Sequence, residues 1–148
     1  MKADGDPVPA FVKLNARWNA EPSAPHPEVE IVGSTVVFRF TLNPWAFPEF
    51  PEGSVGSLTF SGCSRWRLGD TNDEGWYLGQ CRYSGIAPEW GEFYELVGAD
   101  IRRDLPTDWQ VIAAADHASA RHFLFYLRDE TFECLALDWT FSWSPPSR

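Results

Sequence analysis

Apolar and polar residues alternate most regularly in STVVFRFTLN, residues 34–43. In an extended strand, successive side chains point to opposite faces. One face of this segment is therefore apolar and consists of Val36, Phe38, Phe40 and Leu42. The other face, which carries Arg39 and Thr41, is polar enough to meet water. The pattern predicts a strand with one face in the core.

The aromatic-rich stretch of residues 121–143 predicts two further strands joined by a tight turn at Asp129–Glu130. In RHFLFYLR, residues 121–128, both faces are apolar, which is typical of an inner strand covered on both sides. In TFECLALDWTFSW, residues 131–143, one face is apolar and the other can meet water. That apolar face would consist of Leu135, Leu137, Trp139, Phe141 and Trp143. We therefore expect most of the aromatic side chains in this stretch to belong to the core.

The rest of the chain reads as shorter strands and connections. The predicted strands are residues 10–18, residues 57–70 and 75–85 around the turn GDTNDEG, and a short strand within 106–120 followed by a turn or short helix. Residues 19–30 contain three prolines, which remove backbone donors, so we expect an extended connector there. The segment 87–101 has both helical and strand spacing, and its aromatic content and Gly91 favour a strand.

These elements predict a mainly β fold, either an antiparallel β-sandwich or a strongly twisted sheet. One short helix on a face, near residues 88–98 or 112–121, remains an open variant of this fold. A chain of 148 residues has the size of one domain. We expect residues 1–9 to form a flexible lead-in, residues 10–144 to form the globular domain, and residues 145–148 to form a tail.

The composition provides enough apolar residues for a core that needs no disulfide bond or metal ion. Hydrophobic residues make up 44% of the chain and aromatic residues 16%. A domain of this size buries roughly 70% of the surface that its unfolded chain exposes. Cys63, Cys81 and Cys134 are widely spaced and lie among apolar neighbours. We therefore expect buried free thiols rather than disulfides or a zinc site.

The charge balance narrows the class of partner. Twelve Lys+Arg against 21 Asp+Glu give a formal net charge of −9. Nucleic acids and anionic membranes require a basic face, so neither is expected as a partner. A basic protein fits better, because attraction between opposite charges speeds encounter. The N-terminal residues show no apolar signal-peptide core, and the chain has no run of 18 apolar residues, so the expected location is the cytoplasm.

Few residues have the spacing of a catalytic or metal site. The sequence DTNDEG, residues 70–75, resembles the start of a calcium loop, but Cys81 stands where the twelfth-position acid is required. His117 and His122 match no standard metal-ligand spacing, and His122 falls on an apolar strand, where a hydrogen-bonded core histidine is expected. No nucleophile elbow, phosphate loop or dinucleotide motif is present. No catalytic residue, metal or cofactor is therefore predicted.

The loop NPWAFPEFPEG, residues 43–53, is the first feature that suggests recognition. It carries Trp45, Phe47 and Phe50 between prolines, and a loop cannot easily hide three large aromatic side chains. Exposed apolar residues commonly mark interaction sites, and aromatic residues dominate interface hot spots. The alternative is that the loop folds back and caps the core.

A cluster of acids is the second such feature. Residues 70–108 contain nine acids and three arginines, a local charge of −6. Trp90, Glu92, Glu95 and Asp104 would give this region the mixture of aromatic and acidic groups that suits docking of a basic protein. The alternative is an ordinary solvated rim.

The leading functional expectation is a small intracellular protein-binding module that neutralises a basic enzyme or toxin, as an immunity protein does. One alternative is a small-molecule or carbohydrate-binding β-domain, in which Trp45 and Trp90 stack on sugar rings. A third is an enzyme that uses His117 or His122. The amphipathic C-terminal strand could equally form a homodimer through a sheet edge.

Overall fold

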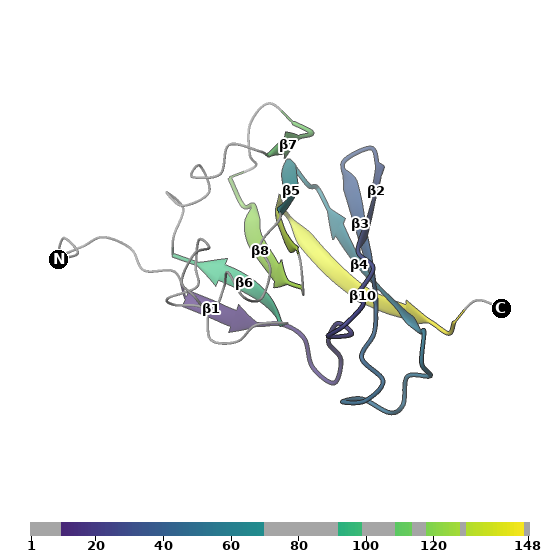
Figure 1. Cartoon of the computed structure of the whole chain (residues 1–148). Helices are drawn as coiled ribbons and strands as arrows, with labels where there is room; N and C mark the ends of the chain where they lie inside the picture. The colour runs from purple at the N-terminus through teal and green to yellow at the C-terminus, as the bar shows by residue number, and fades with distance from the viewer. Residues whose placement is uncertain (1–9, 70–91, 99–108, 114–117, 128–129, 147–148) are drawn as a thin grey trace.

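Two antiparallel β-sheets packed face to face form the fold (Figure 1). The computed structural model describes residues 10–69, 92–98, 109–113, 118–127 and 130–146, and these residues contain ten strands and no helix. The predicted mainly β sandwich is therefore confirmed. No helix of membrane-spanning length and apolarity occurs in the described parts of the chain.

The six-stranded sheet has the strand order β1-β6-β8-β9-β5-β7, and the four-stranded sheet has the order β10-β4-β3-β2. The strands of the first sheet are β1 (Ala10–Lys13), β6 (Phe93–Val97), β8 (Arg121–Tyr126), β9 (Thr131–Ala136), β5 (Arg65–Gly69) and β7 (Gln110–Val111). Those of the second are β10 (Asp138–Ser144), β4 (Val55–Ser61), β3 (Thr35–Thr41) and β2 (Glu28–Val32).

The central strands of the four-stranded sheet have one buried and one partly exposed face, as the alternation of residues 34–43 predicted. Buried and intermediate residues alternate along the whole of β3 and nearly all of β4. Phe38 pairs with Leu58 and Val36 pairs with Phe60, so the apolar residues of both strands point to the same side. This side faces the other sheet.

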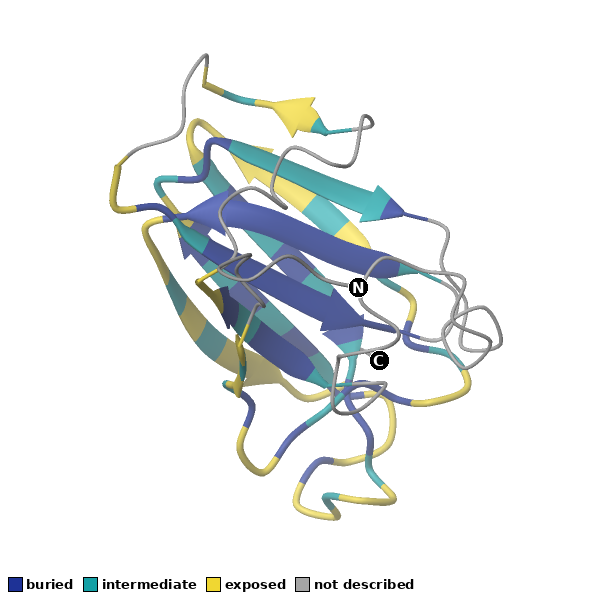
Figure 2. Ribbon diagram, turned by 90° about the vertical axis from the view of Figure 1, so that its left-hand side faces the viewer, coloured by how far each residue is buried: buried dark blue, intermediate teal, exposed yellow. Residues whose placement is uncertain are grey.

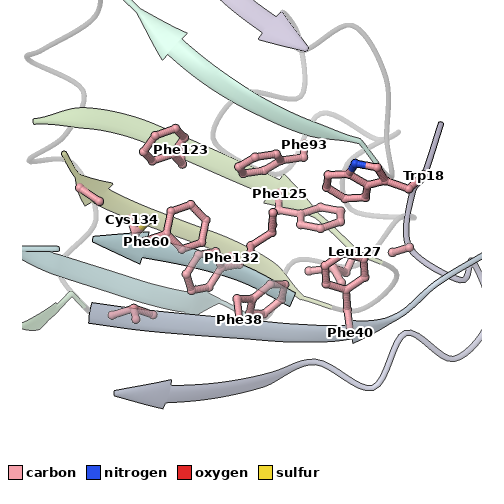
Figure 3. Close-up of a cluster of buried hydrophobic side chains, with 14 of the residues drawn as sticks. Trp18, Phe38, Phe40, Phe60, Phe93, Phe123, Phe125, Leu127, Phe132 and Cys134 are labelled. Atoms are coloured by element: carbon pink, nitrogen blue, oxygen red, sulfur yellow. The ribbon is translucent and has the colours of Figure 1, made fainter. Parts of the chain in front are cut away.

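Aromatic rings fill the space between the two sheets (Figure 3). Phe38 of β3 stacks on Phe132 of β9, with ring centroids 4.4 Å apart and an interplanar angle of 19°. The ring centroids of Phe60 in β4 and Phe123 in β8 lie 5.2 Å apart. Most of the aromatic density in residues 121–143 therefore belongs to the core, as predicted.

The two central strands of the six-stranded sheet are buried on both faces. Every residue of β9 is buried, as is every residue of β8 from His122 onward (Figure 2). The inner face joins the main core, and the outer face carries a second cluster of Tyr94, Leu96, Leu124 and Tyr126, with Phe11 packed against it. The prediction of a strand covered on both sides is confirmed for β8, and the predicted hairpin is confirmed by its antiparallel pairing with β9.

Two segments that were each predicted as one strand are in fact two strands in different sheets. Residues 57–70 divide into the end of β4 and β5, and residues 131–143 divide into β9 and β10. The prediction of a single strand over residues 131–143, with one face exposed to water, was therefore wrong. Leu135 pairs with His122 on the outer face of the six-stranded sheet, Leu137 lies in the link, and Phe141 faces the core from β10. Local alternation continues through such a link, which is why the pattern did not reveal it.

Other strand boundaries in the structure also differ from those that the sequence predicted. The connector predicted over residues 19–30 gives way to β2 from Glu28, because Val29 and Ile31 pair with β3. The strand predicted over residues 10–18 ends at Lys13. The ambiguous segment 87–101 contains strand β6 rather than a helix.

Some predictions fall partly or wholly outside the described residues. The strand predicted over residues 75–85 is one of them, as are the lead-in 1–9, Asp129 of the hairpin turn, and part of the region 112–121 in which a helix remained open. In the described parts of that last region the chain forms bends and a turn, and Arg121 begins β8. The short strand predicted within residues 106–120 is β7.

Candidate functional site

The loop of residues 43–53, which connects β3 to β4, is held firmly at both ends. The side-chain oxygen of Asn43 accepts hydrogen bonds from the backbone N–H groups of Trp45, at 3.1 Å, and Ala46, at 3.2 Å. At the other end the Leu42 N–H donates to the Ser54 carbonyl at 2.9 Å. Asn side chains suit this role because they cap the donors of a turn.

The three aromatic residues of this loop have different environments. Phe50 is buried, and its ring lies 5.0 Å from that of Trp143 in an edge-to-face arrangement. Phe47 is half-buried and packs against the core. Trp45, in contrast, is 66% exposed. Both sequence interpretations therefore describe part of the loop, which caps the core with its phenylalanines and presents a tryptophan to solvent.

A second proline-containing segment, residues 20–27, runs beside the end of β3. The Glu21 N–H donates to the Thr41 carbonyl at 2.8 Å, and the Thr41 N–H donates to the Pro25 carbonyl at 2.7 Å. Ala20 also forms an isolated antiparallel bridge with Leu42. These backbone bonds attach the 20–27 segment to the strand from which the 43–53 loop departs.

A pocket of about 220 Å³ lies between the 20–27 segment and the 43–53 loop. Its lining includes Glu21, Ala24 and His26 from the segment, Trp45, Glu52 and Gly53 from the loop, and Thr41 from β3. His26 has a positive φ of 47°, which is uncommon for a residue other than glycine. The exposed indole therefore borders a hollow whose ionisable side chains are two carboxylates and one imidazole.

The Glu21 carboxylate is the most unusual group in the pocket lining. Glu21 is only 7% exposed, and its two oxygens accept hydrogen bonds from the backbone N–H groups of Ser23 and Ala24, each at 2.7 Å. Within the described ranges, no lysine, arginine or histidine forms an ion pair with it. Buried carboxylates are rare unless they are paired. The neighbouring Glu52 is exposed, so it adds negative charge at the rim.

The pocket is not built for a metal ion. In the parts of the chain that the structure describes, no three acidic, histidine or cysteine side chains are placed to hold a metal together. Calcium takes six to eight oxygen ligands and structural zinc takes four N or S ligands. The chemistry of the lining instead suits an organic cation, which needs a negative field and a flat aromatic surface.

The acids that the sequence singled out are engaged within the chain. Glu92 lies 3.5 Å from the Lys13 ammonium group. Glu95 forms a 2.8 Å ion pair with Arg121, which also lies 3.2 Å from Asp138. The hydrogen bond with Glu95 is the main cause that raises the pKa of Arg121 above its ordinary value. Trp90 and Asp104, the other members of that predicted surface, lie outside the described residues.

His122 is a core histidine, as its place on an apolar strand predicted. It is 2% exposed, and its Nε2 atom contacts the carboxylate of Glu133, which is 1% exposed. Arg67 approaches the other carboxylate oxygen at 3.4 Å. This buried pair joins β8 to β9 on the outer face of the six-stranded sheet. His117 lies outside the described residues.

Cys63 and Cys134 are buried free thiols, as predicted, and Cys81 lies outside the described residues. Burial raises the pKa of the Cys134 thiol well above its ordinary value, and the neighbouring Cys63 and Glu133 raise it further. A thiol that stays protonated at neutral pH is a poor nucleophile. Cys134 therefore acts as a core residue.

Sequence reasoning found Trp45 but missed Glu21, His26 and Glu52. Glu21 and His26 fall in a segment that reads only as a proline-rich connector. Two proline-rich segments of similar length, one on each side of the best-defined strand, were the available signal. Nothing in their composition indicates that backbone bonds to Thr41 place them side by side.

Comparison of the chain with protein-family models, curated proteins and solved structures finds no match. Its function is therefore inferred from the geometry and charge of the site.

Proposed function

We propose that this protein is a small protein-binding module that captures a basic partner, in the manner of an inhibitor or immunity protein that neutralises a cationic enzyme or toxin. The observation that carries the proposal is Trp45, which is 66% exposed on a loop whose Phe50 is buried in the core. Tryptophan is enriched among the hot spots of protein interfaces.

Rigidity supports this role for the 43–53 loop. Phe50 is buried beneath the loop, and Asn43 and Ser54 hold its two ends through hydrogen bonds. A side chain presented on a pre-ordered backbone loses less conformational entropy on binding than one on a mobile loop. Trp45 is therefore suited to serve as an anchor for a partner.

Charge supports a basic partner. The chain carries a net charge of −9, which favours rapid encounter with a cationic protein. Glu92 and Glu95 contribute to this long-range field, although both are paired with cations of this chain. Glu52 has no cation partner in the described ranges, so it is the more direct contact for a basic group at the edge of the Trp45 site. The proposed location remains the cytoplasm, in keeping with the free thiols of Cys63 and Cys134.

The experiment begins with capture of partners by tagged protein in extracts of the native cells, followed by purification of the captured protein. Association is then measured with pure components at low and high salt. We expect the association rate to fall as salt rises. Trp45→Ala should weaken binding about thirtyfold, which corresponds to ~2 kcal/mol for a hot-spot residue.

Val111→Ala is the matched control for the Trp45 variant, because Val111 is 61% exposed and lies on β7 of the other sheet. This variant should bind within about twofold of the unmodified protein, as expected for an exposed position away from the interface. Equal binding by the Trp45 and Val111 variants, or a partner without net positive charge, would contradict the proposal.

A second candidate function is binding of a carbohydrate or another small molecule at the same tryptophan, since an exposed indole can stack on a sugar ring. The pocket beside Trp45, at about 220 Å³, is smaller than the roughly 300–1,000 Å³ typical of sites for drug-sized ligands. Titration of tryptophan fluorescence with a glycan and metabolite panel tests this candidate. A saturable change with a neutral glycan would favour it over the protein-binding proposal.

The third candidate, a histidine-dependent enzyme, has less support. His122 is almost fully buried against Glu133, whereas a catalytic base must reach its substrate. Full activity in His117→Ala and His122→Ala variants, together with an elemental analysis that shows no metal, would remove this candidate.

A further inference from the structure

We infer that the pocket between the 20–27 segment and the 43–53 loop is a receptor for one organic cation, the ammonium or guanidinium group of a lysine or arginine side chain. The inference rests on the proposed function and makes it specific, because it assigns the contact through which a basic partner is recognised. Three groups carry it: the buried carboxylate of Glu21, the exposed carboxylate of Glu52 and the indole of Trp45.

The first step concerns the buried charge of Glu21. Its hydrogen bonds from Ser23 and Ala24 orient the carboxylate and stabilise it, but backbone dipoles do not cancel a full charge. Poor access to water leaves that charge weakly screened, so its field in the pocket is stronger than that of a surface acid. A cation that enters the pocket supplies the counter-charge that is absent from the described part of the chain.

The second step concerns the walls of the pocket. Trp45 and Glu52 both line the pocket, so an indole ring and a second carboxylate border it. The face of an indole attracts ammonium and guanidinium groups because its π electrons form a negative surface. Lysine and arginine side chains also have apolar stems that can lie along a ring while the charged head meets a carboxylate. One side chain can therefore satisfy all three groups.

The third step concerns size. A volume of about 220 Å³ is small for an oligosaccharide or a drug-sized ligand, but it suits the end of one long side chain. The metal alternative lacks a ligand set in the described residues. A single organic cation is the ligand class that fits both the volume and the charge.

The fourth step concerns order in the unbound protein. Hydrogen bonds fix the two sides of the pocket relative to β3. On one side the Thr41 N–H donates to the Pro25 carbonyl, and on the other the Asn43 side chain accepts from the N–H groups of Trp45 and Ala46. The walls therefore need little rearrangement on binding, which lowers the entropic cost of recognising a small group.

The experiment uses the full chain labelled with ¹⁵N and titrated with two probes, N-acetyl-lysine methylamide and N-acetyl-arginine methylamide. Norleucine and citrulline derivatives with the same blocking groups are the neutral controls. The readouts are the indole N–H signal of Trp45 and the backbone N–H signal of Gly53, which also lines the pocket. We expect saturable shifts at millimolar concentration with one or both cations, no saturable shift with the neutral controls, and weaker binding as salt rises.

Two variants localise the effect. Glu52→Gln should weaken cation binding about two- to fivefold, whereas Glu30→Gln, which makes the same charge change at an exposed position of β2, should leave it unchanged. Trp45→Ala should abolish the Gly53 shift without unfolding the protein, because the side chain is largely exposed. Equal effects of the Glu52 and Glu30 variants would overturn the inference.

The probes separate this inference from the proposed function. If neither cation causes the expected shifts, or if the neutral controls cause equal shifts, the inference is overturned even if a basic protein partner binds. Cation binding that depends on Trp45 and Glu52 would support the pocket even if no basic protein partner is found, and in that case only the proposed function fails.

Discussion

Gly62 and Leu137 lie against each other at the corner where the chain passes twice from one sheet to the other. A methyl group on Gly62 would come within 2.7 Å of the Leu137 Cδ1 atom. The link from β4 to β5 runs through Gly62, and the link from β9 to β10 consists of Leu137. The Leu137 N–H donates to the Ser61 carbonyl at 2.9 Å, so the two crossings are also joined by their backbones.

Gly62→Ala should destabilise the protein more than Gly33→Ala. Both glycines have a φ of +60°, so each substitution carries the cost of a left-handed alanine, about 1–2 kcal/mol. Only the Gly62 variant also collides with Leu137, since no atom lies within 4 Å of the corresponding position at Gly33. Overpacking adds about 1–3 kcal/mol. Urea denaturation measures the difference, and equal losses would show that the corner relaxes freely.

Glu133→Ala should cost ~3–5 kcal/mol of unfolding free energy, because it leaves two cationic or polar partners, Arg67 and His122, without their buried acid. Glu30→Ala is the matched control. It removes an ion pair with Arg39 whose side chains are 52% and 39% exposed, so its cost should stay within about 1 kcal/mol. Similar losses for both variants in denaturant titrations would mean that the buried pair contributes little to stability.

Trp18→Ala should be far more damaging to stability than Trp45→Ala. Trp18 is 5% exposed and stacks on Phe141, with ring centroids 4.3 Å apart and planes 3° apart. Its removal leaves a cavity and should cost about 3–5 kcal/mol. Trp45→Ala should change stability by less than about 0.5 kcal/mol, because that ring is mainly in solvent. A large loss on truncating Trp45 would show that its ring supports the fold.

The protein should lose stability in alkaline solution partly through Cys134. Burial raises the pKa of this thiol in the folded state, whereas the unfolded thiol ionises near its ordinary value of about 8.5. The unfolded state therefore releases a proton first as pH rises. The Cys134 contribution is fully present below about pH 8.5 and declines, by at most about 1.4 kcal/mol per pH unit, until pH passes the folded pKa.

Cys134→Ala tests this assignment. Its unfolding free energy should fall less steeply between about pH 8 and pH 10 than that of the unmodified protein, because the variant has no thiol to ionise at this position. Because Cys63 lies beside Cys134, the difference between the two slopes reports the Cys134 thiol together with its interaction with Cys63. Parallel pH profiles would assign the alkaline loss to other groups.

The predictions that succeeded depended on neighbouring residues. The alternation of Val36, Phe38 and Phe40 identified β3 and its core face, and the apolar faces of RHFLFYLR identified β8 as an inner strand. The predictions that failed depended on where a strand stops. Alternation continues unbroken through Leu137, and only the pairing of β9 with β8 and of β10 with β4 shows that the chain changes sheets there.

The candidate site, too, could be predicted only where its residues are close together in the sequence. Trp45 was identifiable from its proline-rich loop, because a loop has little room for three aromatic rings. Which of those rings would remain exposed depended on Phe50 meeting Trp143, a residue far along the chain. Glu21 reaches the pocket because its backbone N–H bonds to the Thr41 carbonyl. This contact was not visible in the sequence.

The sequence alone determined that the fold is mainly β, which face of β3 is apolar, and that the protein carries a strong negative charge. Those properties follow from the local geometry of the backbone and from simple counting of residues. The tertiary structure decided which sheet each strand joins, which aromatic residue faces solvent, and that a buried carboxylate lies beside it in one pocket. Those features depend on contacts between residues distant in the chain, and alternation along a single strand carries no information about such contacts.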